Sequence, residues 1–241
     1  MTRRVRNAII VVALAVAATA VVAISPGISG ATEGSGIRAG TVTSSPPPGT
    51  PLLDKMATPA TGCAGGSGPY WWANLWGSAN HGPGYQDVRR VMEVSGVNNG
   101  LSAHLWTWNG MDRQYWCMYL AYRDLADGLN VYNLVSYISY LSVTPNMCLD
   151  VEGPSRANGA KVHQWDCNGW IDPRSQQWKQ IPMGYGSVKV DPYVRTYEFK
   201  NMYSGRCLDL TAYGVDDGTP FQQWDCKTNP DDILTTNQLF Y

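Results

Sequence analysis

Three copies of one motif follow each other along the chain. Two positions recur at a fixed spacing, a mid-repeat Trp every 59 residues and a late Gln every 62 residues. The members of the two series are Trp106, Trp165 and Trp224, and Gln114, Gln176 and Gln238. Repeats of this length indicate one supersecondary unit per copy, and such units bury their apolar faces by packing on one another. The sequence therefore predicts three similar units around a shared core.

The pattern inside a repeat is short and typical of β-strands. Residues 197–203 alternate loosely between apolar and polar, and the pairs Asn158-Gly159 and Asp217-Gly218 are hairpin turn signals. Residues 132–143 are rich in Tyr, Val, Ile and Leu, which favours a strand over a helix. After the N-terminal leader we find no helical periodicity, so an all-β fold is predicted.

Four of the six cysteines follow the repeat. Cys148 and Cys167 are 19 residues apart, as are Cys207 and Cys226, while both matching positions of the first copy have lost their Cys. A joint loss is expected of a bonded pair, because a lone thiol is a liability outside the cell. We therefore predict these two disulfides and, by elimination, a third between Cys63 and Cys117. No CxxC is present, which argues against a metal site.

The N-terminal segment has the order of an export signal. Residues 1–7 are basic, residues 8–24 are apolar except for one Thr, and small residues follow. We predict a cleaved signal peptide at 1–24, with an uncleaved membrane anchor as the alternative. Residues 25–62 are dominated by Gly, Ser, Thr and Pro and are predicted to be a disordered linker, so the folded domain would span 63–241.

The quoted residues resemble the ricin B-type lectin family, which is built from QxW repeats. The matching marks are Cys-Leu-Asp-Val at 148–151, Asn-Gly-x-x-Val at 158–162, Trp-Asp-Cys-Asn-Gly at 165–169 and Gln-Gln-Trp at 176–178. The resemblance covers about residue 63 to the end and is strongest over 146–241. It implies a β-trefoil of three pseudo-symmetric repeats, each able to hold one shallow carbohydrate site.

The resemblance also implies a role for each site residue. An early Asp accepts hydrogen bonds from sugar hydroxyls, and the mid-repeat aromatic ring stacks on the pyranose. A polar residue two positions before that ring, and an Asn-Gln pair near the end of the repeat, complete the contacts or hold the Asp. In the third repeat the set is Asp209, Gln222, Trp224, Asn237 and Gln238.

The other two repeats depart from this set. The second has Asp150, His163, Trp165 and Gln176, with Ser175 in place of Asn. The first departs furthest, with Glu93, His104, Trp106, Arg113 and Gln114. We rank the sites third, second, first. The alternative for each residue is structural: Trp116, Trp178 and Phe240 fit the core, the late Gln residues can be structural, and the Asp residues can cap turns.

Together these features predict a secreted, non-catalytic lectin that binds galactose-type sugars or plant and microbial polysaccharides, without cofactor or metal. His104 and His163 fall in separate repeats, and no catalytic motif is present. The alternatives are an extracellular trefoil scaffold that binds protein, or an accessory module of a secreted glycoside hydrolase. A net charge of −1 without a basic stripe argues against nucleic acid. No membrane association is expected after signal cleavage, and the oligomeric state stays open.

Overall fold

The computed structural model describes residues 41–43, 62–79, 88–142, 146–167, 173–187, 193–227, 229 and 233–241. The chain divides into two units, 1–34 and 35–241, and all described residues belong to the second unit. The predicted signal peptide and nearly all of the predicted linker lie outside the described residues.

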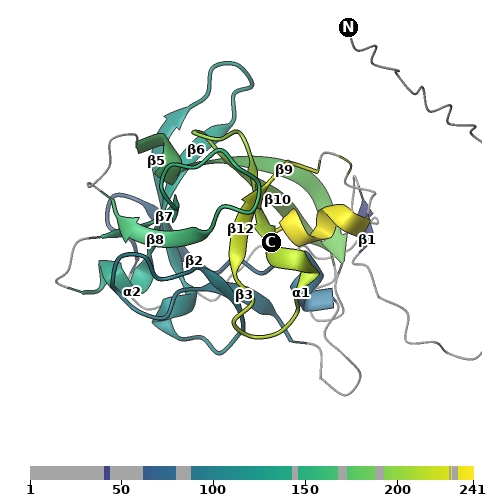
Figure 1. The fold of residues 1–241 in the computed structure, drawn as a ribbon, viewed down its shortest axis with the longest axis horizontal. Coiled ribbons are helices and arrows are strands. Elements are labelled where there is room, and N and C mark those ends of the chain that lie inside the picture. The colour runs from purple at the N-terminus through teal and green to yellow at the C-terminus, as the bar shows by residue number, and fades with distance from the viewer. Residues whose placement is uncertain are drawn as a thin grey trace, which may run out of the picture. The chain divides into compact units, whose positions relative to one another are not determined.

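The described elements form three successive lobes, each with a strand, a hairpin and a short helix, and the first two lobes end in a further strand (Figure 1). The first lobe contains β2 (Ser67–Tyr70), α1 (Leu75–Ala79), β3 (Arg90–Glu93), β4 (His104–Thr107), η1 (Asp112–Gln114) and β5 (Trp116–Arg123). The second contains β6 (Asn130–Ser136), α2 (Tyr137–Tyr140), β7 (Met147–Val151), β8 (Val162–Asp166), η2 (Pro173–Gln176) and β9 (Gln177–Ser187). The third contains β10 (Val194–Asn201), β11 (Cys207–Leu210), η3 (Thr211–Tyr213), β12 (Phe221–Trp224) and η4 (Ile233–Gln238). The fold is a β-trefoil, as the resemblance implied.

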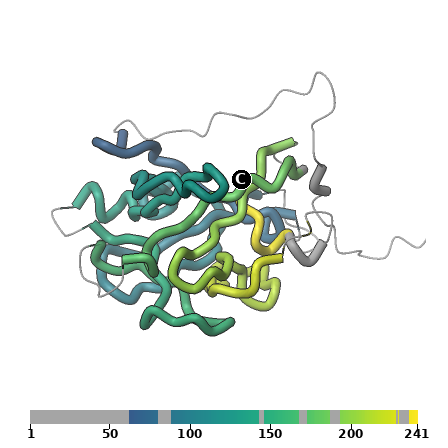
Figure 2. Tube along the Cα trace, turned by 90° about the horizontal axis from the view of Figure 1, so that it is seen from above, coloured from purple at the N-terminus to yellow at the C-terminus, as the bar shows by residue number. Residues whose placement is uncertain are grey.

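The three hairpins share one register. In each hairpin the mid-repeat Trp is paired with the residue two positions before the early acid of the repeat (Glu93, Asp150 or Asp209). The pairs are Val91↔Trp106, Cys148↔Trp165 and Cys207↔Trp224. The longer strands pair in the order β5, β6, β9, β10, and the β9–β10 pair can be followed through the green part of the trace in Figure 2. Residues at equivalent positions of the three repeats therefore lie at equivalent positions of the three hairpins.

The last residues close the ring of lobes onto the first. The backbones of Ala73 and Tyr241 exchange two hydrogen bonds of 3.0 Å, and Leu75 N donates to Leu239 O at 2.8 Å. A bridge between Tyr197 and Phe240 joins the same segment to β10. The last described residues are therefore paired with both the first lobe and the third lobe.

The core is made by equivalent apolar residues from all three repeats. Each of the following layers is fully buried: Ala103, Val162 and Phe221; Met92, Leu149 and Leu208; Trp116, Trp178 and Phe240. The indole nitrogens of Trp116 and Trp178 donate to the carbonyls of Met92 and Leu149. The last layer confirms that the late aromatic position of each repeat serves the core.

Neighbouring lobes are joined by a buried Gln. Gln164 Nε2 donates to the carbonyls of Gly96 and Asn98 at 2.7 and 2.9 Å. Gln223 Nε2 makes the equivalent bonds to Ser155 and Ala157 at 2.9 and 2.8 Å. Each amide therefore holds the turn of the preceding repeat against its own hairpin.

The structure confirms the three predicted disulfides, Cys63–Cys117, Cys148–Cys167 and Cys207–Cys226. The turn predictions also hold, since Gly159 and Gly218 adopt positive φ values of 80° and 90° that favour glycine. No helix within the described residues is long and apolar enough to span a membrane.

Two secondary-structure expectations need correction. The strand expected over 132–143 ends at Ser136, and Tyr137–Tyr140 form helix α2, where Ser139 Oγ bonds the Ser136 carbonyl. Composition alone does not show this helix because its side chains suit a strand equally well. Within the predicted linker, Thr41–Thr43 form strand β1, which pairs with β9. The Thr-Val-Thr sequence has a high β-propensity, and it pairs with the C-terminal end of β9, where Thr41 is opposite Ser187.

Candidate functional site

The third-lobe site lies on one face of the β11–β12 hairpin. Asp209 on β11 is directly opposite Gln222 on β12, and Trp224 follows two residues later on the same strand. Side chains two residues apart on a strand point to the same face. The predicted acid, amide and indole are therefore brought together, and Trp224 is 40% exposed beside the buried Asp209.

Asp209 is held by the other predicted residues. Its Oδ1 accepts a hydrogen bond from Gln222 Nε2 at 2.9 Å. Its Oδ2 accepts from Asn237 Nδ2 at 2.9 Å and from Gln238 Nε2 at 2.8 Å. Both donors come from the end of η4 and are almost fully buried. Asn237 and Gln238 therefore position the carboxylate, while Oδ1 keeps acceptor capacity beyond its single bond.

Two residues of this site were missed by sequence reasoning. Lys227 Nζ lies 3.4 Å from Asp209 Oδ2 and donates to Asn237 Oδ1 at 2.6 Å and to Tyr213 Oη at 2.8 Å. Tyr213 and the preceding Ala212 both have positive φ values, near 50°, which are strained for residues with a Cβ. Only the position of Lys227 directly after Trp-Asp-Cys signalled its role, and the other repeats have no Lys there.

A turn of the preceding lobe borders the site Trp. Asn158 Nδ2 donates to Asp225 Oδ2 at 2.8 Å, and Arg206 forms an ion pair with the same carboxylate. A Cβ atom at Gly159 would lie 3.7 Å from Trp224 Cζ3, so the indole packs against this turn. The third site is therefore built by two lobes.

The same arrangement recurs around the ring. Asn99 Oδ1 accepts a bond from Asp166 N, and Asp217 Oδ1 accepts one from Thr107 N, each at 2.7 Å. Asp217 also forms an ion pair with Arg90. Asp217 is therefore an exposed residue that connects the third lobe to the first.

The second-lobe site has buried polar atoms without protein partners. Asp150 Oδ2 lies 3.5 Å from Gln176 Nε2 and 3.7 Å from His163 Nε2. Within the described part of the chain, Asp150 Oδ1 and both ring nitrogens of His163 have no hydrogen-bond partner. Trp165 stands beside His163, with ring centroids 5.4 Å apart. Buried polar atoms in this state are costly unless a ligand or water satisfies them.

The first-lobe site is closed by an ion pair. Glu93 Oε2 accepts a bond from Gln114 Nε2 at 2.8 Å, and Glu93 Oε1 lies 2.8 Å from Arg113 Nε. The Nε–H group is not aimed at the oxygen, so the Arg113 contact is ionic rather than a hydrogen bond. Burial alone lowers the pKa of His104, but the Glu93 carboxylate and the Ser102 carbonyl outweigh it and raise that pKa above its ordinary value.

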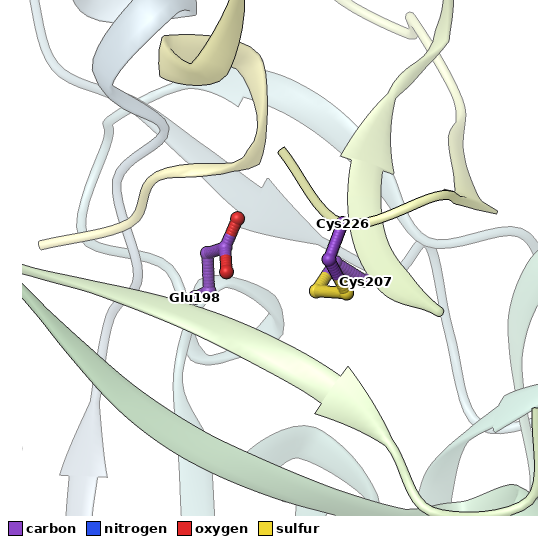
Figure 3. A group of neighbouring side chains, drawn as sticks. All are labelled: Glu198, Cys207 and Cys226. Carbon is purple, nitrogen blue, oxygen red and sulfur yellow. A yellow bond between two sulfur atoms is a disulfide. The ribbon is translucent and has the colours of Figure 1, made fainter. Parts of the chain in front are cut away.

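A carboxylate outside these sites lies beside a disulfide. Glu198 on β10 is near the sulfurs of Cys207 and Cys226 (Figure 3). The two sulfurs are bonded to each other, so no thiolate is present to bind a metal. Glu198 is 2% exposed, and burial raises its pKa to about 7. This group is a buried acid rather than a metal site.

Comparison with known proteins agrees with this geometry. Residues 130–224 match the family model described as ricin-type beta-trefoil lectin domain-like. This segment is therefore similar to ricin-type β-trefoil lectin domains. The matched lectin-like segment contains the second-lobe hairpin and the third-lobe hairpin up to Trp224. A comparison with curated proteins gives no match.

Solved structures that this chain matches include a designed protein and two natural ones. The designed three-fold symmetric protein ThreeFoil is 25% identical, with a TM-score of 0.47, over 63% of this chain and 88% of that chain. An exo-beta-1,3-galactanase from Clostridium thermocellum is 22% identical, with a TM-score of 0.47, over 70% of this chain and 28% of that chain. The Rhizoctonia solani agglutinin is 10% identical, with a TM-score of 0.45, over 70% of this chain and 89% of that chain.

Proposed function

We propose that this protein is a secreted, non-catalytic lectin that binds galactose-type sugars or plant and microbial polysaccharides. The observation that carries the proposal is the pairing of the buried Asp209 carboxylate with the 40% exposed Trp224 indole on one hairpin face. A carboxylate makes strong charge-assisted bonds to hydroxyl groups, and a flat indole suits the apolar face of a pyranose.

The third lobe would bind through a rim of polar groups around the ring. Gln222 and Lys227 are partly exposed beside Trp224, and both contact Asp209. A sugar hydroxyl can donate to Asp209 Oδ1 and accept from Lys227 Nζ. Asn237 and Gln238 then act by positioning the acid.

The second lobe would bind a sugar through buried polar atoms that have no hydrogen-bond partner among the described residues. A sugar hydroxyl placed beside Trp165 can donate to Asp150 Oδ1 and share a hydrogen bond with His163. Sites in two lobes of one rigid body would raise the avidity for a polymeric glycan above that of either site.

The test compares the two site indoles with an unrelated aromatic residue. Glycan binding is measured by calorimetry for wild type, Trp165→Ala, Trp224→Ala and the double variant, using galactan and xylan fragments. Tyr122→Ala is the matched control, because Tyr122 is 39% exposed on the β5–β6 hairpin. We expect each Trp variant to lose about tenfold or more in affinity, near 1.4 kcal/mol.

The double variant should lose binding while it keeps the melting temperature of the Tyr122 control. Equal glycan affinity in the wild type and the double variant would reject the proposed sites. Binding to no glycan by the folded wild type would instead favour a trefoil that acts as a protein-binding scaffold.

A further inference from the structure

The first lobe differs from the other two where Arg113 replaces a small polar residue. The equivalent side chains, Ser175 and Asn237, are buried, whereas the Arg113 side chain is 33% exposed. The lobe therefore presents a cation at the position where its neighbours present a buried hydroxyl or amide.

Both oxygens of the acid of this lobe already have a partner, and one of these partners is a guanidinium. Gln114 and Arg113 contact the two oxygens of Glu93, each at 2.8 Å. In the second lobe, by contrast, Asp150 Oδ1 has no partner among the described residues. The Glu93 carboxylate is therefore less available to a sugar hydroxyl than the Asp150 carboxylate.

The outer end of Arg113 remains available. No described residue accepts a hydrogen bond from its Nη groups, and Asp112, the adjacent acid, forms no ion pair with it within the described residues. The guanidinium carbon lies 5.9 Å from the centre of the Trp106 ring, which is partly exposed. A planar donor group and an indole therefore lie side by side at the surface.

Two carboxylates of this lobe's surroundings are paired with arginines. Arg113 pairs with Glu93, and Arg90 pairs with Asp217 at the far side of the same hairpin. Asp112 is an exposed acid next to Arg113, so the contact of an anion with the guanidinium has to outweigh the repulsion from this carboxylate. A guanidinium binds carboxylate or sulfate oxygens with two parallel hydrogen bonds, a geometry that a neutral hydroxyl does not match.

From this arrangement we propose that the first lobe binds the acidic group of a charged glycan. Arg113 holds a carboxylate or sulfate group, and Trp106 contacts the ring of the pyranose that carries it. This inference rests on the proposed function, because it assigns a second substrate class to one lobe of the same lectin.

The experiment uses pairs of glycans that differ only in charge. One pair is oligogalacturonate and its methyl ester, and the other is a sulfated galactan and its desulfated form. We expect the wild type to prefer the charged member of at least one pair by fivefold or more, and the preferred pair identifies the acid group. Arg113→Gln should abolish the preference, and Arg113→Lys should retain part of it.

Arg195→Gln is the matched control, because it removes one exposed cation from β10, outside the first lobe. Equal affinity for charged and uncharged partners, or equal losses in Arg113→Gln and Arg195→Gln, would overturn the inference. Neutral galactan binding that still depends on Trp224 would then leave the proposed function intact. Failure to bind any of these glycans would remove both proposals.

Discussion

Gln238 Nε2 bridges Asp209 Oδ2 and the Asp225 carbonyl, at 2.8 and 3.0 Å. Gln114 and Gln176 make the equivalent pair of contacts in their own lobes, to Glu93 and the Thr107 carbonyl, and to Asp150 and the Asp166 carbonyl. The late Gln of each repeat therefore links the site acid to the backbone of the residue that follows the site Trp. It fixes the position of the acid relative to the strand that carries the Trp.

Replacing Gln238 by Met should destabilise the protein and weaken glycan binding together. Met has a similar volume but removes two donors, one of them to a buried carboxylate, and it removes the acceptor for Lys227 N. We expect a loss of about 2–3 kcal/mol in unfolding free energy, measured by urea denaturation. Gln222→Met, which removes a single hydrogen bond to Asp209, should cost less. Equal effects of the two substitutions would contradict this role for Gln238.

Stability should fall as the pH rises through neutrality because of Glu198. Its pKa is about 7 in the folded protein, against an ordinary value of 4.5, so it stays protonated when folded while the unfolded chain ionises. This contribution is fully present below pH 4.5 and is lost as the pH rises through 7. The loss is of the order of 3 kcal/mol.

The measurement compares urea unfolding of wild type and Glu198→Gln from pH 5 to pH 8. The amide of the variant is neutral throughout, so its free energy of unfolding should not decline with pH for this reason. The stability of the variant relative to wild type should therefore increase as the pH rises. Parallel pH profiles would show that Glu198 titrates normally.

The disulfides should differ in their effect on stability. Cys63–Cys117 closes a loop with a sequence separation of 54, whereas Cys207–Cys226 spans 19. Loop-closure entropy predicts losses of about 4 and about 3 kcal/mol when each pair is replaced by Ala. Thermal and urea unfolding of the two double variants provide the comparison. A larger loss for the shorter loop would mean that local packing outweighs the entropy of the unfolded chain.

Gln223→Leu should loosen the contact between the second and third lobes. The substitution removes two bonds, to the carbonyls of Ser155 and Ala157, and we expect a loss of about 1–2 kcal/mol. Leu is sterically suitable because Leu105 occupies the equivalent position in the first lobe, where it is buried. Hydrogen exchange should show faster exchange at Gly159 N, which bonds to the Gln223 carbonyl at 2.9 Å. Unchanged exchange there would show that the backbone bond alone holds the turn.

Much of the fold and site followed from the repeat spacing. Trp106, Trp165 and Trp224 lie at equivalent places because each sits at the same register of its hairpin. Two of the disulfides followed for the same reason, because Cys148–Cys167 and Cys207–Cys226 have the same spacing in their copies, whereas Cys63–Cys117 followed by elimination. The repeat spacing identifies such residues because their positions depend on a local hairpin geometry that every lobe shares.

Lys227, Tyr213 and Asp217 were not found in this way. Lys227 reaches Tyr213 through a contact between two loops of the third lobe, and Asp217 reaches Arg90 in a different lobe. Loops that differ between repeats carry no periodic signal, so these partners appear only once the chain is folded. The helix Tyr137–Tyr140 was missed because its side chains have the composition of a strand.

The turns around Asn99, Asn158 and Asp217 each support the hairpin of the next lobe, the last of them reaching back to the first. A single repeat cut from the chain would keep its acid and its indole yet lack the neighbour that borders them. We therefore expect each proposed site to require two assembled lobes. Local unfolding of one lobe should impair two sites, its own and that of the next lobe. Glycan affinity can therefore report on whether the whole domain has folded.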